Sequence, residues 1–238
     1  MNTGTPFTDR YDRKFLFDAM MGPNAMRIME EMANFLPLSP GMRVLDLGCG
    51  MGISSIVLAE KFGVTVFAAD LWISPTDNFR RFAGLGLDGK IFPFLVDATR
   101  EIPFAHGYFD MIVSVDSYQY YGGNATMLPK LLPFVKKGGF IAIAVPGFIR
   151  DFPEGELPEE VRPFWTPEWY FYSRDWWRSL WQKEAGATIT ESRDMDCNRQ
   201  AWDEWLESSS HHAQNDKPMM DAGAGKYFTL VQMIAKKN

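Results

Sequence analysis

The chain has few of the residues that build disulfide frameworks and metal centres. Among its 238 residues are only two cysteines, Cys49 and Cys197, and three histidines. Neither cysteine belongs to a CxxC motif or to a Cys/His cluster. The sequence therefore argues against a disulfide scaffold and a structural zinc site, and we expect no bound metal.

Long apolar runs and an excess of basic residues are also missing. No apolar run approaches the roughly 20 residues that span a bilayer, and residues 1–13 lack the apolar core of a signal peptide. The formal net charge is −6, which is opposite to the basic face that nucleic acids require. With 46% hydrophobic residues the chain can bury a sizeable core. We expect one acidic globular domain over 1–238, located in the cytoplasm, with a small molecule as its partner.

Short β-branched or aromatic runs alternate with helical patterns through the first 145 residues. Strands are predicted at 43–47, 64–70, 91–96, 109–115 and 140–145, with helices between them at 52–62, 74–85 and 125–135. Further along, the pattern predicts a helix over 173–186 and strands at 188–192 and 227–235. Because strands alternate with helices, we expect parallel βαβ units in a sheet that is covered on both faces.

The strongest functional signal is the segment 44–52, VLDLGCGMG, at the end of the first predicted strand. Gly48, Gly50 and Gly52 let the backbone turn sharply and let a ligand approach, and the next helix points its free N–H groups at that ligand. A nicotinamide-dependent oxidoreductase would use a similar turn. The third glycine comes one position early for the dinucleotide fingerprint, however, and Asp46 would sit poorly beside a pyrophosphate. A cationic or hydrogen-bond-donating ligand suits Asp46 better.

Acidic residues also follow the next strands. Asp70 ends the second predicted strand, where it could accept ribose hydroxyls, and Leu71 and Trp72 could flank a purine ring. Asp97 follows the third strand, where an aspartate is often only a turn former. In an open parallel sheet these strand ends share one edge, which is where ligands bind.

The pattern [V/I]-L-D-x-G-x-G-x-G, together with the acids at these strand ends, resembles class I S-adenosylmethionine-dependent methyltransferases over about residues 40–146. The resemblance implies a Rossmann-like seven-stranded α/β sheet in the order 3-2-1-4-5-7-6, with the last strand antiparallel and helices on both faces. More narrowly, the chain is similar to the small-molecule branch with quinone-biosynthesis, sarcosine/dimethylglycine and cyclopropane-fatty-acid-synthase-like methyltransferases. The DPPY-type motif of enzymes that methylate planar nitrogens is absent, because the segment 116–119 reads DSYQ.

The resemblance also implies the roles of individual residues. The cofactor S-adenosyl-L-methionine would be bound by Asp46, Gly48, Cys49, Gly50, Gly52, Asp70, Leu71, Trp72, Asp97, Ala98 and Asp116. Asp97 would receive the adenine amine. Asp116, Tyr118 and Tyr120 are the candidate catalytic residues, with Asp116 as the first candidate for a base.

Two flanking segments complete the expected domain. Residues 1–39 are predicted to form an N-terminal helical cap, with methionines at helical spacing over 15–32. The aromatic and acidic segment 147–172 is predicted to be a lid over the acceptor, and its alternative is a satellite core. The expected function is methyl transfer to a small molecule by in-line displacement. The alternatives are a non-catalytic or partner-activated S-adenosylmethionine-binding protein and, less favoured, an NAD-dependent oxidoreductase.

Overall fold

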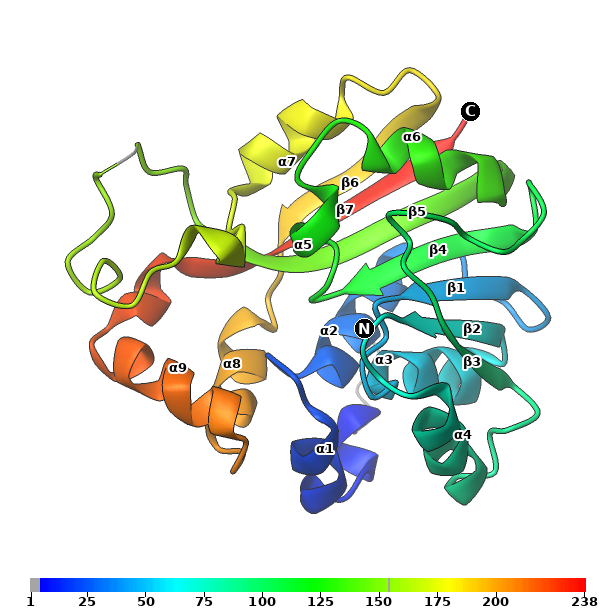
Figure 1. Ribbon diagram of the computed structural model, residues 1–238, viewed down its shortest axis with the longest axis horizontal. Coiled ribbons are helices and arrows are strands. Elements are labelled where there is room, and N and C mark those ends of the chain that lie inside the picture. Colours follow the sequence, from blue (N-terminus) through cyan, green and yellow to red (C-terminus); the bar gives the residue numbers. More distant parts are fainter. Residues whose placement is uncertain (1–4, 154) are drawn as a thin grey trace.

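The computed structural model describes residues 5–153 and 155–238. Residues 1–4 of the predicted cap and Glu154 of the predicted lid lie outside the described residues. Seven strands form one sheet in the order β3-β2-β1-β4-β5-β7-β6 (Figure 1). Strand β7 runs antiparallel to both β5 and β6, whereas the other pairs are parallel. The predicted fold class and strand order are therefore confirmed.

Each predicted strand is present. The strands are β1 (Arg43–Leu47), β2 (Thr65–Asp70), β3 (Ile91–Leu95), β4 (Phe109–Val115), β5 (Val135–Phe148), β6 (Ala187–Asp194) and β7 (Phe228–Lys237). Strand β5 is longer than predicted because it pairs with β7 from Phe140 to Phe148 and with β4 from Val135 onward. This extension carries β5 through Pro146 and Gly147.

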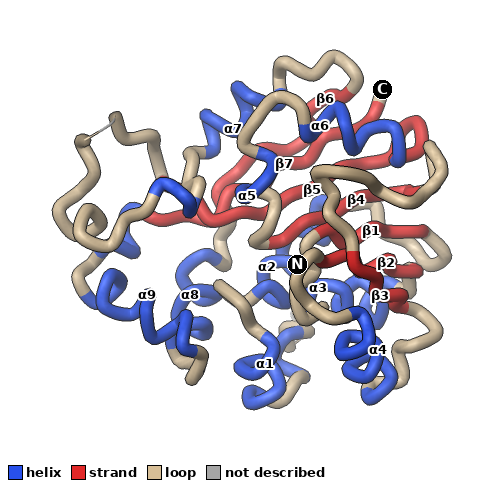
Figure 2. Tube along the Cα trace, in the orientation of Figure 1, coloured by secondary structure: helices blue, strands red, loops and turns tan. Residues whose placement is uncertain are grey.

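Helices cover both faces of the sheet (Figures 1 and 2). The α-helices of the described residues are α1 (Arg13–Ala19), α2 (Ala25–Met32), α3 (Ile53–Ile56), α4 (Pro75–Gly84), α5 (Gln119–Gly122), α6 (Met127–Leu131), α7 (Arg174–Trp181), α8 (Asn198–Leu206) and α9 (His211–Asp221). Helices α5, α6 and α7 lie on one face, and the others lie on the opposite face. Helix α3 continues as a π-helical turn, Val57–Lys61, before Gly63 ends it.

The methionine-rich segment 15–32 is not one helix, so its helical interpretation is wrong at the centre. Helix α1 ends at Ala19 and α2 begins at Ala25. Pro23 disfavours helical geometry at the residue before it, Gly22. The Asn24 side chain then accepts hydrogen bonds from the next backbone N–H groups and caps α2. The break leaves a short connection at the carboxyl edge of the sheet.

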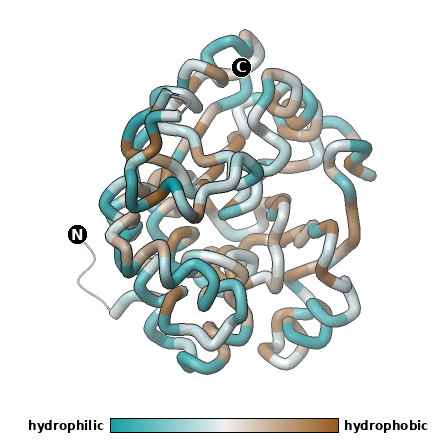
Figure 3. Tube along the Cα trace, turned by 60° about the vertical axis from the view of Figure 1, so that its left-hand side comes forward, coloured by the Kyte–Doolittle hydropathy of each residue, from teal (hydrophilic) through white to brown (hydrophobic). Residues whose placement is uncertain are grey.

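Each face of the sheet buries its own hydrophobic core. On the α2 side, Met26 and Met29 are fully buried against the sheet and α3. On the α7 side, Trp177 and Trp181 are 0% and 2% exposed and pack against the sheet and Tyr118. Figure 3 shows hydrophilic stretches along much of the outline of the molecule. Two-sided burial is what a largely parallel sheet requires.

None of the helices in 5–153 and 155–238 is long and apolar enough to cross a membrane.

Candidate functional site

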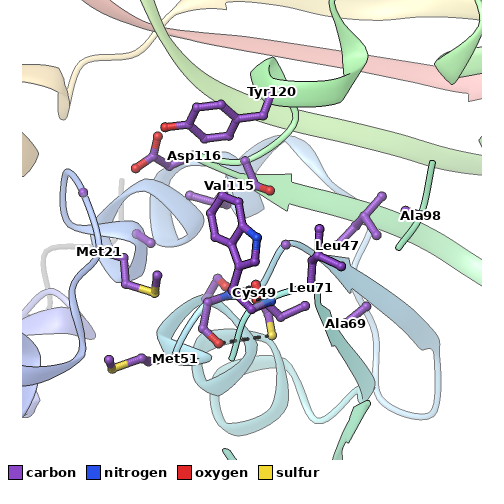
Figure 4. Close-up of a pocket in the computed structure, with 18 of the residues that line it drawn as sticks. Met21, Leu47, Cys49, Met51, Ala69, Leu71, Ala98, Val115, Asp116 and Tyr120 are labelled. Carbon is purple, nitrogen blue, oxygen red and sulfur yellow. Dashed lines mark hydrogen bonds between the residues drawn. The ribbon is translucent and has the colours of Figure 1, made fainter. Parts of the chain in front are cut away.

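A cavity of about 360 Å³ opens at the carboxyl ends of strands β1 to β4 (Figure 4). Its wall contains residues from the segments 47–54, 69–72, 96–99 and 115–121, which follow these strands. Residues from 19–25, which span the connection between α1 and α2, line the cavity as well. The sheet therefore brings most of the predicted site residues to one place.

The glycine-rich turn after β1 needs its glycines for close approaches. Gly48 has φ +72°, and a β-carbon there would lie 1.8 Å from Ser117 Oγ. Gly52 has φ +83°, and a β-carbon there would lie 2.4 Å from Phe82 Cζ in α4. Gly52 thus sets the packing between α3 and α4 and does not line the cavity, whereas Gly48 and Cys49 do.

Asp70 joins the turns after β1 and β2. Its Oδ2 accepts the N–H of Gly50 at 2.8 Å, and its Oδ1 accepts the N–H groups of Trp72 at 2.7 Å and Ile73 at 2.9 Å. A carboxylate has about four acceptor positions, so Oδ2 can accept one further hydrogen bond. Asp70 lines the cavity.

Residues after β2 and β3 form the far wall of the cavity. Leu71 and Trp72 line it and are 49% and 72% exposed. Asp97 and Ala98 line it as well. Asp97 Oδ1 accepts hydrogen bonds from the backbone N–H of Thr99 at 2.9 Å and from its hydroxyl at 2.5 Å, and the latter lowers the pKa of Asp97. Asp97 is therefore both a turn former and a wall residue.

Asp46 lies beneath the glycine-rich turn and does not line the cavity. It is 0% exposed, and its Oδ2 accepts the hydroxyls of Ser54 at 2.7 Å and Ser55 at 2.6 Å. Its Oδ1 has no hydrogen-bond partner among the described residues. Burial raises the pKa of Asp46 to about 6. In this structure its contacts tie β1 to α3.

The end of β4 presents a carboxylate at the cavity. Asp116 has φ +50°, and its N–H donates to Ala144 O at 2.8 Å. Its Oδ1 accepts the Gln119 side-chain amide at 3.0 Å. Burial raises the pKa of Asp116 to about 7, so this carboxyl group changes its charge near neutral pH. Figure 4 shows the Tyr120 hydroxyl beside Asp116 at the rim of the cavity.

The positions of two tyrosines close to Tyr120, Tyr118 and Tyr121, differ from those that the sequence predicted. Tyr118 is 0% exposed and lies on the α7 side, with its ring 5.7 Å from that of Trp177, so the structure does not bring it to the cavity. Tyr121 lines the cavity, and its hydroxyl is 3.2 Å from Ser114 Oγ. Tyr118 precedes the one-turn helix α5 and Tyr121 lies within it. Their side chains point in different directions, so only Tyr121 lines the cavity.

The sequence predicted a helical cap in 1–39, but not that the break between α1 and α2 supplies part of the cavity wall. Met21 and Gly22 line the cavity, and a β-carbon at Gly22 would lie 2.0 Å from Asp116 Oδ2. The run Gly22-Pro23-Asn24, a helix break followed by a cap, was the signal that could have revealed it.

The cavity wall is acidic. It contains Asp70, Asp97 and Asp116, and none of the lining residues that the structure describes is a lysine, arginine or histidine. A pyrophosphate would therefore meet carboxylates without a balancing cation. Within 5–153 and 155–238 no cluster of three or more His, Cys, Asp or Glu residues could hold a metal ion.

Residues 44–139 match the family model described as "Methyltransferase domain". This central stretch is similar to methyltransferase domains. It holds the glycine-rich turn and the acids after β2, β3 and β4, so the resemblance expected from those residues is confirmed. A second model, "Protein-L-isoaspartate(D-aspartate) O-methyltransferase", matches residues 17–70.

Relatives of the methyltransferase domain include two curated enzymes. A 2-methyl-6-phytyl-1,4-hydroquinone methyltransferase from Synechocystis sp. is 36% identical over 107 residues, which are 45% of this chain and 33% of that protein. A sarcosine/dimethylglycine N-methyltransferase from Halorhodospira halochloris is 32% identical over 134 residues, which are 55% of this chain and 47% of that protein. The chain thus spans between a third and a half of the length of these two relatives.

A solved structure extends the likeness of the fold beyond that domain. The phosphoethanolamine N-methyltransferase 2 of Haemonchus contortus, in complex with phosphomonomethylethanolamine and S-adenosylhomocysteine, superposes with a TM-score of 0.71. It is 18% identical and covers 96% of this chain and 58% of its own. At this identity the likeness establishes the fold.

Proposed function

We propose that the protein is an S-adenosylmethionine-dependent methyltransferase that transfers the methyl group to a small-molecule acceptor by in-line displacement. The observation that carries the proposal is the cavity itself. It joins the glycine-rich turn to Asp70, and its wall has carboxylates but, among its described residues, no basic side chain. The family match over 44–139 supports the same activity.

The residues of the cavity suit this cofactor better than a dinucleotide. Asp70 Oδ2 has an acceptor position left for a ribose hydroxyl, and Leu71 and Trp72, which line the cavity, would flank a purine. Asp97 and Ala98, which also line the cavity, would meet the polar edge of the purine. The volume of about 360 Å³ falls within the usual range for ligand sites. When bound, the cofactor supplies an electrophilic methyl group on a positively charged sulfur.

The chain's own contribution to the reaction is alignment and proton removal. Holding two reactants in line can provide on the order of 7 kcal/mol or more of the barrier reduction. Asp116 has a pKa of about 7 and lies at the cavity wall, so we assign it the role of base for an acceptor that must lose a proton. Tyr120, at the same wall, orients the acceptor. Tyr118 has no role in this proposal because it lies outside the cavity.

Two segments are proposed to enclose the acceptor. Within 1–39, the connection 19–25 supplies part of the cavity wall and acts as the cap. No described residue of 147–172 lines the cavity, but the Tyr170 ring lies edge-on to that of Tyr120, with centroids 6.5 Å apart. We propose that 147–172 closes over the acceptor through this contact. Phe148 and Trp165 anchor it to the core, with ring centroids 5.1 Å apart.

Calorimetric titration tests the cofactor, and transfer of a labelled methyl group tests the reaction. We expect S-adenosylhomocysteine to bind and NADH not to bind, and a panel of small metabolites to contain an acceptor. Binding of NADH in place of S-adenosylhomocysteine would favour the oxidoreductase. Cofactor binding without transfer to any acceptor would favour the non-catalytic alternative. A cytoplasmic location stays a prediction from the composition.

A further inference from the structure

Helix α4 holds the glycine-rich turn with its buried face. The two buried residues of this helix, Asn78 and Phe82, are four positions apart and therefore lie on one side of it. Phe82 packs against Gly52, and the Asn78 Nδ2 donates to Gly50 O at 2.9 Å. Asn78 and Phe82 do not line the cavity, so α4 contacts the turn from outside the cavity wall.

Arg81 sets the orientation of the Asn78 amide. Arg81 is partly buried, and its Nη1 donates to Asn78 Oδ1 and, at 3.2 Å, to Met51 O. Because the amide oxygen accepts from the guanidinium, the amide NH2 group faces the carbonyl of Gly50. Two successive carbonyl groups of the turn, those of Gly50 and Met51, are thus bound by α4.

The chain segment that binds the carbonyl of Gly50 also binds its N–H. Asp70 Oδ2 accepts this N–H at 2.8 Å, and α4 begins shortly after Asp70, at Pro75. Gly50 has φ +54°, and a glycine can leave such a conformation more easily than any other residue. Hydrogen bonds on both sides of Gly50 therefore fix a position that the backbone alone leaves free.

The rest of the turn is held by the chain as well. The N–H groups of Gly48 and Cys49 both donate to Ala69 O, at 2.8 and 3.0 Å. The peptide between Gly50 and Met51 is planar, so binding its oxygen to α4 points the Met51 N–H in the opposite direction. Loss of the bond to α4 would leave this peptide free to rotate.

We propose that Asn78 and Arg81 are positioning residues for cofactor binding, which hold Gly50 and Met51 in the conformation that receives the cofactor. The inference rests on the proposed function and concerns the same cavity, because Gly50 and Met51 line it. Asn78 and Arg81 do not line it, so they act through the backbone of the turn. If only a tenth of the molecules have the competent turn, the apparent affinity falls tenfold.

Three variants remove the contacts of α4 in different ways. Asn78→Ala removes the hydrogen bonds to Gly50 and to Arg81. Asn78→Asp keeps an oxygen for Arg81, but its carboxylate cannot donate to the carbonyl of Gly50. Arg81→Met removes the bonds to Met51 and Asn78 and keeps much of the aliphatic side chain.

Two matched variants serve as controls. Arg80→Met removes the same charge from the neighbouring position of α4, where Arg80 is exposed and pairs with Asp77 at 2.9 Å. Asn198→Ala removes a similar bond, from the Asn198 side-chain amide to Phe228 O at 3.1 Å, at a residue that does not line the cavity.

Calorimetric titration with S-adenosylhomocysteine, well below the unfolding temperature of each variant, measures the affinity. Both Asn78 variants should bind about tenfold more weakly than the wild type, and Arg81→Met about threefold more weakly. Arg80→Met and Asn198→Ala should keep the wild-type affinity. A purely structural role of Asn78 would lower the free energy of unfolding without this change.

Amide hydrogen exchange at Gly50, followed by NMR, reports on the turn itself. The N–H of Gly50 is bound to Asp70, so it should exchange faster in Asn78→Ala when the turn is loosened. Saturating S-adenosylhomocysteine should slow the exchange again. Asn198→Ala should leave it unchanged.

Affinity and exchange must change together in the Asn78 variants. A change in only one of them, or in neither, overturns the inference and leaves the methyltransferase proposal standing, provided that the wild type binds S-adenosylhomocysteine. An equal loss of affinity in Asn198→Ala also overturns it, because general destabilisation would then be the cause. If Asn78→Ala does not fold, Asn78→Asp and Arg81→Met provide the same comparison. Failure of the wild type to bind S-adenosylhomocysteine overturns both proposals.

Discussion

Gly22 packs directly against the carboxylate of Asp116, and both residues line the cavity. A β-carbon at position 22 would lie 2.0 Å from Asp116 Oδ2. A residue of the connection between α1 and α2 therefore fixes how close this wall comes to the end of β4. The N-terminal segment and the central stretch 44–139 meet at this contact.

Gly22→Ala should slow methyl transfer about tenfold or more, because the new methyl group must displace either Asp116 or the connection from its aligned position. Overpacking of this kind costs about 1–3 kcal/mol of folding free energy. Gly89→Ala is the control, since a β-carbon at Gly89 meets nothing within 4 Å. Steady-state kinetics and urea unfolding of both variants check this, and equal rates would show that the contact has no role in transfer.

Tyr118→Phe and Tyr120→Phe form a matched pair. The Tyr118 hydroxyl is buried without a partner among the described residues, so its removal should leave activity unchanged and raise stability by up to about 1 kcal/mol. Tyr120 lines the cavity beside Asp116, so its loss should lower kcat/KM by about tenfold. Initial rates of methyl transfer to one acceptor, measured for both variants, test these expectations. A large loss in Tyr118→Phe would restore the catalytic role predicted for that residue.

The sequence predicted the scaffold of the site well because its signals are local. The segment 44–52 combines a buried strand, close-approach glycines and a helix start, and the structure uses Gly48 and Gly52 for close approaches. Alternation of strands and helices fixed the parallel part of the sheet. Asp70 lines the cavity because a strand-ending acid in a parallel sheet lies at its carboxyl edge, and its role as a ribose ligand stays a prediction.

Other features of the site depend on side-chain directions and hydrogen-bond partners that cannot be read from the sequence. Tyr118 and Tyr121 are three residues apart, and only the direction in which α5 starts determines that Tyr121 faces the cavity. Asp46 fits the motif, but its Oδ2 is engaged by Ser54 and Ser55.

The pH dependence of stability should carry a signature of Asp116. Its pKa is raised from 3.8 to about 7 by burial, so the folded state binds a proton more tightly than the unfolded state. The resulting stability is fully present below pH 3.8 and is lost as the pH rises through about 7. The asparagine in Asp116→Asn does not titrate. The free energy of unfolding of this variant relative to that of the wild type should therefore rise between pH 4 and pH 8, by at most about 4 kcal/mol. Urea unfolding across this range measures it, and a pH-independent difference would contradict the raised pKa.

Asp70→Ala and Asp70→Asn should separate the two tasks of this carboxylate. Asp70 accepts N–H groups from Gly50, Trp72 and Ile73, so alanine leaves three backbone donors without their partner. We expect alanine to lower the free energy of unfolding by about 1–3 kcal/mol and to weaken S-adenosylhomocysteine binding by a similar amount.

Asparagine keeps one side-chain oxygen but replaces the other with an NH2 group, which cannot accept a hydrogen bond from Gly50 or from a ribose hydroxyl. If that NH2 takes the place of Oδ2, the bonds to Trp72 and Ile73 survive, so asparagine should fold more stably than alanine while binding the nucleoside about as weakly. Thermal unfolding and calorimetric titration with S-adenosylhomocysteine measure the two effects separately. Wild-type affinity in both variants would remove Asp70 from the nucleoside site, because a ribose hydroxyl held by this carboxylate cannot be lost without a change in binding free energy.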